Sequence, residues 1–376
     1  MAEPASLFIL AGEASGDRIG AALLEELRAR RALDISGVGG EEMTEQGLVS
    51  LFPMRDLSVM GFADVVRRLP LLLWRLRQVT RTILRTRPDC VVLIDSQVFS
   101  QTIAYRLRKA GYTGRIVLYV APSVWAYRPE RARTIAPLYD EVLAVLPFEP
   151  KAMADLGGPE TVYVGHPALD RFPFRPENPA SGPLMLLPGS RTGELRRHLP
   201  LMRAVAEALA GTVAVEGFVI PTPRALHETV AAMAGDWSVP VTIVSDATGR
   251  ADALRRCIAA FAVSGTATLE LALAGVPHAI TYVAESWQVK TYRKSGTTPW
   301  IGLPNILAAR EVAPELIFAG EAEPERAIAV MRTLVSDASV REAQRAAFQD
   351  IRSLMQNGAP EAPRLDPVDR IAALLD

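Results

Sequence analysis

The 376-residue sequence is poor in the side chains from which disulfides and metal sites are built. It has 2 cysteines, Cys90 and Cys257, in apolar stretches about half the chain apart, and only 4 scattered histidines. It contains no Cys-x-x-Cys pair and no Asp-x-Asp triplet of the kind that holds a divalent ion on a nucleotide-sugar diphosphate. We therefore expect two buried free thiols, a cytoplasmic location, no bound metal and no cofactor.

Long hydrophobic runs and an excess of one charge are also missing. No apolar run reaches the roughly eighteen residues of a membrane-spanning helix, and the N-terminus lacks the basic region and cleavage site of a signal peptide. The formal net charge is -1, so no overall field attracts nucleic acid. The sequence thus predicts neither a transmembrane nor an exported protein, and binding partners have to be argued from local patches.

The chain does contain a regular alternation of short apolar strands and helix-length segments. Strands are expected near residues 7–10, 35–38, 90–94, 116–120, 141–146 and 162–164, and again near 184–187, 217–220, 241–244, 258–263 and 278–283. This alternation predicts α/β domains with parallel sheets covered on both faces. We interpret 171–183 as a linker and 357–363 as a loop between helices over 324–357 and 367–375. The prediction is two Rossmann-like domains, residues 1–170 and 184–345, followed by C-terminal helices over 346–376.

Residues 264–277 predict a turn and a short helix after a buried strand. Thr266 could cap this helix, and Gly275 stands where a left-handed residue would end it. The free N–H groups at such a helix start, together with the helix dipole, favour a phosphate. Glu270, one turn in, could accept hydrogen bonds from a ribose diol. The alternative is an ordinary α/β turn, with Glu270 as an exposed helix position.

A similar strand, turn and helix precede it at 184–191. Pro188 and Gly189 form the turn, Ser190 could cap the next helix, and Arg191 could reach over the strand ends to a diphosphate. The alternative is a surface arginine. Further polar side chains, in the otherwise apolar segment 303–316, are either ligand contacts or a buried network that ties a helix to the sheet: Asn305, Arg310 and Glu311.

In the first domain, Asp95 directly follows a predicted buried strand. A carboxylate at the end of a parallel strand lies where α/β folds place catalytic groups, and partial desolvation there raises its pKa towards that of a general base. The alternative is that Asp95 caps a helix beginning near Ser100. Glu13 and Asp17, in the turn after the first strand, are the competing carboxylates.

Two further features concern apolar side chains. Trp125 follows another predicted strand, where it could wall a pocket, although aromatic residues at strand ends are more often core. The segment 65–87 is rich in arginine and has no acidic residue. Pro70 suits a helix start there, and a stripe at helical spacing should face the core. Leu71 and Trp74 lie off that stripe, on a flank with Arg75, Arg81 and Arg85, which is typical of a helix on an anionic membrane; the alternative is a solvated basic helix.

Several short motifs resemble, in order, those of the lipid-A-disaccharide synthase family. They lie at residues 11–17 (Ala-Gly-Glu-Ala-Ser-Gly-Asp), 122–126, 146–149, 164–167, 187–191 (Leu-Pro-Gly-Ser-Arg), 264–270 and 303–308 (Leu-Pro-Asn-Ile-Leu-Ala). The resemblance implies a GT-B glycosyltransferase, with an acceptor- and lipid-binding first domain, a UDP-sugar-binding second domain, a cleft between them, and a final helix packed back on the first domain. Its implied reaction joins UDP-2,3-diacylglucosamine to 2,3-diacylglucosamine 1-phosphate (lipid X) in a β-1,6 linkage, inverting, without metal, at the inner face of the cytoplasmic membrane.

Patterns and resemblance together predict the site residues. The expected base is Asp95, with Glu13 as the second catalytic candidate. Donor binding is expected of Gly189, Ser190, Arg191, Ser264, Gly265, Thr266, Thr268, Glu270, Asn305, Arg310 and Glu311, and acceptor or lipid binding of Ser15, Ser123, Trp125, Leu71 and Trp74. Where many family members have a second aspartate after the first, this chain has Val98. That departure leaves open a non-catalytic nucleotide- or lipid-binding homologue; a UDP-sugar epimerase is the other alternative, and the oligomeric state, including a homodimer, stays open.

Overall fold

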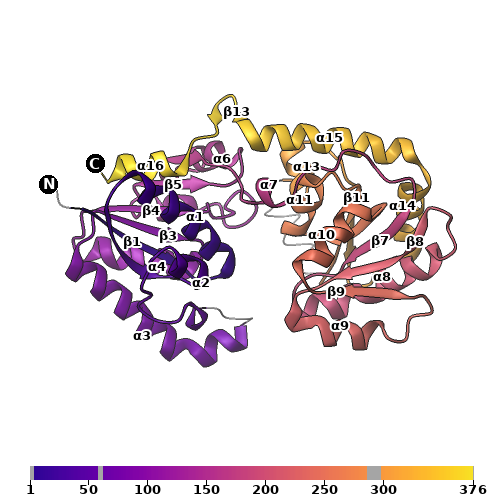
Figure 1. The fold of residues 1–376 in the computed structure, drawn as a ribbon, viewed down its shortest axis with the longest axis horizontal. Coiled ribbons are helices and arrows are strands. Elements are labelled where there is room, and N and C mark those ends of the chain that lie inside the picture. Colours follow the sequence, from indigo (N-terminus) through magenta and orange to yellow (C-terminus); the bar gives the residue numbers. More distant parts are fainter. Residues whose placement is uncertain (1–3, 58–61, 286–297, 376) are drawn as a thin grey trace. The chain divides into compact units, whose positions relative to one another are not determined.

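The computed structural model describes residues 4–57, 62–285 and 298–375. The chain divides into two compact units (Figure 1). The first unit contains Met1–Pro167 and Asn357–Asp376, and the second contains Ala168–Gln356. The chain therefore passes from the first unit to the second and back again.

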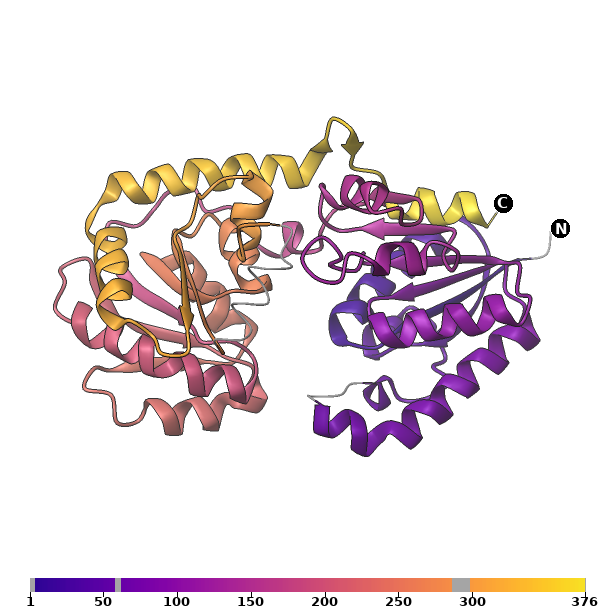
Figure 2. The same ribbon diagram turned by 180° about the vertical axis from the view of Figure 1, so that it is seen from behind.

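The first unit is built on a parallel six-stranded sheet in the order β2-β1-β3-β4-β5-β6. Its strands are β1 (Ala5–Ala11), β2 (Leu33–Val38), β3 (Cys90–Ile94), β4 (Arg115–Tyr119), β5 (Glu141–Ala144) and β6 (Thr161–Tyr163). Its helices are α1 (Ala14–Arg30), α2 (Glu41–Glu45), α3 (Phe62–Thr86), α4 (Gln97–Lys109), α5 (Arg131–Ile135), α6 (Glu149–Asp155) and α16 (Pro367–Leu374). The central strands β3 and β5 are buried along their whole length because helices cover both faces of the sheet (Figures 1 and 2).

The second unit repeats this plan, with the sheet order β12-β11-β10-β7-β8-β9. Its strands are β7 (Gly182–Leu187), β8 (Val215–Pro221), β9 (Val241–Val244), β10 (Ala259–Val263), β11 (His278–Ala284) and β12 (Glu315–Ala319). Its helices are α7 (Ala168–Arg171), α8 (Thr192–Leu209), α9 (His227–Ala234), α10 (Ala247–Arg256), α11 (Thr266–Leu273), α13 (Leu303–Ala308), α14 (Pro324–Ser336) and α15 (Ala338–Asn357). Two parallel Rossmann-like sheets are thus confirmed.

The final helix packs on the first unit, beside α1 (Figure 2). Arg30 of α1 pairs with Asp369 and Asp366, and Arg370 donates from Nε to the buried Glu141 carboxylate of β5 at 2.9 Å. The predicted return of the C-terminal helix to the first domain is confirmed. The connection from α15 to α16 is a short antiparallel hairpin, β13 (Gly358–Ala359) with β14 (Ala362–Pro363), where we expected only a loop.

Several local predictions were wrong. Pro70 lies inside α3 rather than at its start, and the helix passes through it at an exposed position. The expected long helix after residue 324 is interrupted at Asp337, whose carboxylate accepts from Ser339 N at 2.8 Å and so starts α15. The expected linker is packed into the second unit instead, because Phe172 and Arg175 are buried there. Within the described ranges, no helix combines the length and apolarity needed to cross a bilayer.

Candidate active site

In both sheets the second strand of the unit lies on one side of the first strand, and a later strand lies on its other side. The strand order therefore reverses beside the first strand of each unit, at a topological switch point. There the carboxyl ends of β7 and β10 lie next to each other in the second unit, and those of β1 and β3 do so in the first unit. Open α/β sheets bind ligands outside the strand ends at such points. A ligand site is therefore expected at this edge of the sheet in each unit.

A cavity of about 630 Å³ lies at the switch point of the second unit. Ala262 of β10 is paired with Leu187 of β7, so the turns that follow these two strands lie side by side. The volume is within the range of ordinary ligand sites. Most predicted donor residues line this cavity: Gly189, Ser190, Arg191, Ser264, Gly265, Thr266 and Glu270. The other four, Thr268, Asn305, Arg310 and Glu311, are not among the lining residues.

The start of α11 forms one side of this cavity. The helix begins at Thr266, and Gly265 occupies the cap position without a side-chain bond, so the prediction that Thr266 caps the helix was wrong. The buried Thr268 hydroxyl donates to Gly265 O at 2.8 Å and thus supports the turn from inside. Gly275 has a φ of +72°, which confirms the predicted left-handed end of the helix. No side-chain cap bond occupies this helix start, an arrangement that favours a bound anion.

The turn after β7 forms the facing side. Gly189 has a φ of +105°, which favours glycine, and it is followed by Arg191 in the cap position of α8. The expected capping by Ser190 was wrong: the Glu194 side chain accepts from Ser190 N at 2.8 Å, and it lies 3.2 Å from the Arg191 guanidinium. The Arg191 side chain is 80% exposed. A mobile cation therefore lies beside the two turns, as a diphosphate site requires.

Glu270 forms an ion pair with Arg250 of α10, and its side chain is only 13% exposed. The carboxylate that was expected to bind a ribose diol is thus already oriented by a cation, and its Oε2 atom accepts from Arg250. Arg250 also lines the cavity. Sequence reasoning missed it because nothing in the sequence links it to Glu270, which lies 20 residues further on and in another helix.

Asn305 is fully buried and all its hydrogen-bonding groups are used inside the protein. Its amide donates to Ala313 O and to a Glu315 carboxylate oxygen, each at 2.8 Å, and its oxygen accepts from Val312 N at 2.8 Å. The buried-network alternative is therefore confirmed for Asn305, and the structure leaves it no group for a ligand. Arg310 and Glu311 are exposed at the end of this segment.

The first unit places Asp95 at its own switch point. Ile94 of β3 is paired with Ala11 of β1, so Asp95 lies beside the turn that carries Glu13. Asp95 and Ser96 have φ values of +52° and +47°, a left-handed conformation that non-glycine residues rarely adopt. Such backbone strain concentrates at functional sites.

Burial raises the pKa of the Asp95 carboxyl above its usual range. α4 begins at Gln97 with Ser96 in the cap position and no side-chain cap bond, so the alternative in which Asp95 caps the helix was wrong. The Ser100 hydroxyl instead donates to the Asp95 carbonyl at 2.7 Å. The Asp95 carboxylate accepts a backbone hydrogen bond from Ser96, which opposes the effect of burial, and its raised pKa suits a general base.

The turn after β1 contains the two competing carboxylates. Glu13 and Ser15 are exposed, whereas Asp17 is buried and accepts from Gly40 N at 2.6 Å and Glu42 N at 3.1 Å. Asp17 therefore anchors the start of α2, and Glu13 is the carboxylate that faces solvent. Gly12 allows the two turns to approach, because a Cβ at this position would overlap the Ser96 hydroxyl.

Trp125 follows β4 at the same edge and is half-buried, while Ser123 is exposed. The Trp125 ring meets Phe148 edge-on at 5.1 Å, and its Nε1 donates to Glu149 Oε1 at 3.2 Å. Glu149 is buried and also accepts from Leu146 N at 3.0 Å. Desolvation raises its pKa to about 7. Sequence reasoning missed Glu149, although the motif at 146–149 contains it.

The family's second aspartate is replaced by Val98, whose side chain is 77% exposed. The preceding Gln97 donates from Nε2 to Val120 O at 3.2 Å and so ties the start of α4 to the end of β4. Val120 itself has a φ of +76°, a further strained residue at this edge. The departure thus places an apolar side chain in solvent three residues after Asp95 and leaves the Asp95 backbone in its strained turn.

On α3, the predicted core stripe is confirmed: Leu76, Val79 and Ile83 are buried and Leu72 packs against them. Trp74 is 55% exposed as expected, but Leu71 is half-buried. The exposed leucines are Leu69 and Leu73, at 47% and 41%. Arg75, predicted to flank the exposed surface, turns inward over the Phe52 ring and pairs with Asp56 at 2.6 Å.

Among the described residues, no group of three or more His, Cys, Asp or Glu side chains is arranged to hold a metal ion. Cys90 and Cys257 are buried free thiols, as predicted, and burial raises the pKa of both, that of Cys257 to about 11. Thiolate chemistry is therefore disfavoured at both positions.

The two sheets, each with its switch point, have the GT-B fold of sugar-nucleotide enzymes. MurG of Acinetobacter baumannii matches with a TM-score of 0.57 at 14% identity, over 99% of this chain and 99% of that chain. UDP-GlcNAc 2-epimerase of Neisseria meningitidis, solved with UDP-GlcNAc bound, matches with a TM-score of 0.59 at 11% identity, over 94% of this chain and 100% of that one. At such identities the likeness shows the fold alone, and transferases and epimerases share it.

The sequence separates these classes. The family model for lipid-A-disaccharide synthetase matches residues 7–365. Lipid-A-disaccharide synthase of Rhodopseudomonas palustris strain HaA2 is 40% identical over an alignment of 370 residues. The alignment covers 94% of this chain and 92% of that protein. The chain belongs to the lipid-A-disaccharide synthetase family and is a glycosyltransferase; the epimerase and non-catalytic alternatives are not favoured.

Proposed function

We propose that the protein transfers the glucosaminyl residue of UDP-2,3-diacylglucosamine to the 6-hydroxyl of 2,3-diacylglucosamine 1-phosphate. The products are the β-1,6-linked disaccharide 1-phosphate and UDP. The observation that carries this proposal is a pair of sites at the switch points of the two sheets in a chain of this family. The second unit has a cavity beside a helix N-terminus, which favours an anion, and the first unit has a partly desolvated carboxylate on a strained backbone. We assign the donor to the second unit and the acceptor to the first.

In the proposed reaction, Asp95 takes the proton of the acceptor 6-hydroxyl as that oxygen bonds to the donor's anomeric carbon. The bond from this carbon to the UDP oxygen breaks on the opposite face, so the configuration inverts. The N–H groups at the start of α11 and the Arg191 guanidinium stabilise the charge that develops on the departing diphosphate. Glu270, held by Arg250, accepts from the ribose hydroxyls. Ser15, Ser123, Trp125 and Glu13 are proposed to contact the acceptor.

The decisive variant is Asp95→Asn, which keeps the size of the side chain and removes the base. We expect turnover, followed as UDP release from the two diacylated substrates, to fall by about 100-fold or more, with unchanged affinity for UDP. Val98→Ala, at the exposed neighbouring position, is the control and should retain activity. An Asp95→Asn enzyme that releases UDP at the wild-type rate would remove Asp95 from this role.

We also propose that α3 rests on an anionic membrane surface. Support comes from the exposed side chains of Leu69, Leu73 and Trp74 beside the exposed Arg77 and Arg81. Each arginine near anionic lipid contributes about 1 kcal/mol, and the apolar side chains insert at the headgroup level. Arg75 is left out, because it is already paired with Asp56.

The test of the membrane surface is the double variant Leu73→Ser/Trp74→Ser, measured by sedimentation with vesicles that contain anionic lipid. We expect binding to fall by about tenfold or more, from the lost apolar burial. The control is Val213→Ser in the second unit, which removes a 98% accessible apolar side chain and leaves α3 unchanged. Unchanged partitioning of the double variant would refute this surface.

A further inference from the structure

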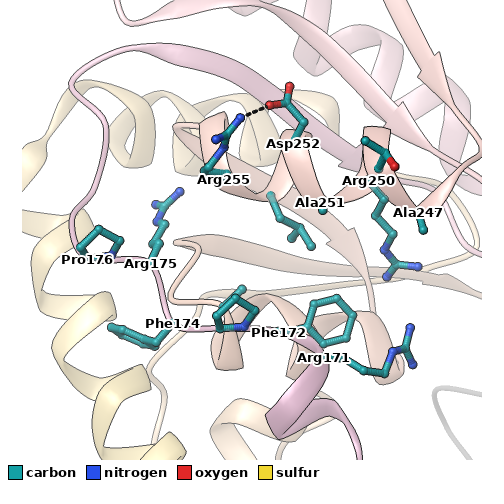
Figure 3. Close-up of a pocket in the computed structure, with 14 residues that line it drawn as sticks. Arg171, Phe172, Phe174, Arg175, Pro176, Ala247, Arg250, Ala251, Asp252 and Arg255 are labelled. Carbon is teal, nitrogen blue, oxygen red and sulfur yellow. Dashed lines mark hydrogen bonds and ion pairs between the residues drawn. The ribbon is translucent and has the colours of Figure 1, made fainter.

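A second cavity, of about 860 Å³, lies within the second unit beside the nucleotide cavity (Figure 3). One wall is the segment 171–176, and the other wall is α10. We call it the α10 groove. Of the residues that line it, only Arg250 has a role in the reaction proposed above.

The walls of the α10 groove are largely apolar. Phe172 and Phe174 form the side of the 171–176 segment, and Ala251 and Leu254 form the side of α10 (Figure 3). Phe174 is held in place because it packs against Gly275, where a Cβ would come within 2.9 Å of its ring. A rigid groove between aromatic rings and a helix face suits an apolar ligand.

Four arginines lie along the groove, and two of them are paired with carboxylates: Arg255 with Asp252 and Arg250 with Glu270. The guanidinium groups of Arg171 and Arg250 lie at one end of the groove, and Arg175 and Arg255 lie towards the other (Figure 3). Arg171 lies 5.1 Å from the centre of the Phe172 ring, and no described carboxylate forms an ion pair with it. Arg175 is buried, and its Nε has no hydrogen-bond partner among the described residues. The groove therefore combines an apolar floor with donors for ester, amide or phosphate oxygens.

The α10 groove adjoins the nucleotide cavity, because Arg171, Ala247 and Arg250 line both. From Ala247 to Arg255 the axis of α10 rises by about 12 Å, so the groove leads away from the sheet edge along the helix. A ligand that fills both cavities needs an anionic head at the strand ends and a long apolar tail.

We propose that the α10 groove binds a fatty acyl chain of the sugar-nucleotide donor. This inference rests on the proposed function, in which the donor carries such chains and the second unit holds its UDP. It assigns the donor's chain to the second unit, apart from the membrane surface on α3. The groove then sets the donor's acyl-chain preference, because each methylene buried in it strengthens binding by about fourfold.

The test blocks the groove without altering the nucleotide cavity. Ala251 is exposed and lines only the α10 groove, so Ala251→Trp fills the groove from a position that tolerates a large side chain. Ala251→Glu is the second variant: it adds a charge to the wall and stands four residues before Arg255, a favourable helix spacing. Ala343→Trp, at an exposed position of α15, is the matched control.

We expect Ala251→Trp and Ala251→Glu to raise KM for long-chain UDP-diacylglucosamine by about tenfold or more. KM for a donor with two-carbon acyl groups, the affinity for UDP and the KM of the acceptor should stay unchanged, and Ala343→Trp should match the wild type. Equal KM values for the long-chain donor in all proteins would overturn the proposal. So would a chain-length effect on the acceptor alone, or a loss of UDP affinity in both Ala251 variants.

A binding measurement separates this proposal from the proposed function. If the wild type binds the long-chain donor more tightly than UDP, and Ala251→Trp abolishes that difference, the groove is supported even where no disaccharide forms. Absence of turnover would then refute the transferase reaction alone. Turnover with an unchanged donor affinity in Ala251→Trp would refute the groove alone.

Discussion

Replacing Glu149 by glutamine should make the protein's stability less dependent on pH. Burial raises the pKa of this carboxyl from 4.5 to about 7, against hydrogen bonds from Trp125 and Leu146 that favour the ionised form. In the unfolded chain the group ionises near its usual pKa, so between about pH 4.5 and 7 the folded state holds a proton that the unfolded state has lost. The stability that this provides is complete at low pH and is lost as the pH rises through 7.

The size of the effect follows from the shift. One pKa unit corresponds to about 1.4 kcal/mol, so the rise to about 7 corresponds to about 3 kcal/mol of unfolding free energy. Glutamine is neutral like the protonated carboxyl and does not titrate. Its NH2 group cannot accept one of the two hydrogen bonds from Trp125 and Leu146, a loss that is the same at every pH. Relative to the wild type, Glu149→Gln should therefore gain about 3 kcal/mol between about pH 4 and pH 8.

The assay is urea unfolding of the wild type and Glu149→Gln in parallel at about pH 4.5, 6 and 8, with the difference in unfolding free energy plotted against pH. Glu130→Gln, an exposed site in the same unit, is the control and should give a flat difference. A flat difference for Glu149→Gln as well, or one that falls with pH, would show that Glu149 is ionised in the folded protein over this whole range. The buried carboxyl beside Trp125 would then need a compensating charge.

Two further predictions concern the turns at the strand ends. Gly12→Ala should destabilise the protein by about 1–3 kcal/mol and lower turnover, because the new methyl group overlaps Ser96. Adding Ser96→Gly should restore both stability and turnover, measured by thermal unfolding and UDP release. Failure of Ser96→Gly to rescue Gly12→Ala would show that the two turns are not coupled. Arg191→Ala should weaken UDP binding about 10- to 100-fold by calorimetry, whereas Arg196→Ala, at an exposed position in α8, should not; equal affinities would place the diphosphate away from Arg191.

The fold could be predicted because its signals are local. The residues of β3 and β9 were expected with their observed bounds, since each is a short apolar run between polar segments. The strand β12 was missed, because it has only five residues and begins inside the segment 303–316, which was expected to be one element. The prediction for Pro70 was wrong because the local preference of proline for a helix start is overridden by the packing of α3 on the core.

The candidate site was only partly predictable. Asp95 and the turns near Gly189 and Gly265 follow strands, and their meeting at a switch point follows from the parallel topology. The pairing of Arg250 with Glu270 joins two helices and depends on how they pack, which no spacing in the sequence reveals. The position of Asn305 shows the opposite error: its family motif marks it as a ligand contact, whereas its amide is used entirely within the protein.

The return of the chain to the first unit has a consequence for biosynthesis. Glu141 lies buried in β5, and the arginine that neutralises it, Arg370, is made 229 residues later. A ribosome that has released β5 has therefore produced a sheet with an uncompensated buried carboxylate, which Arg370 cannot yet reach. The second unit, which is continuous in sequence, can complete its core first. Proteins usually fold their N-terminal domain first during synthesis. In this protein the second unit can complete its fold before the first unit does.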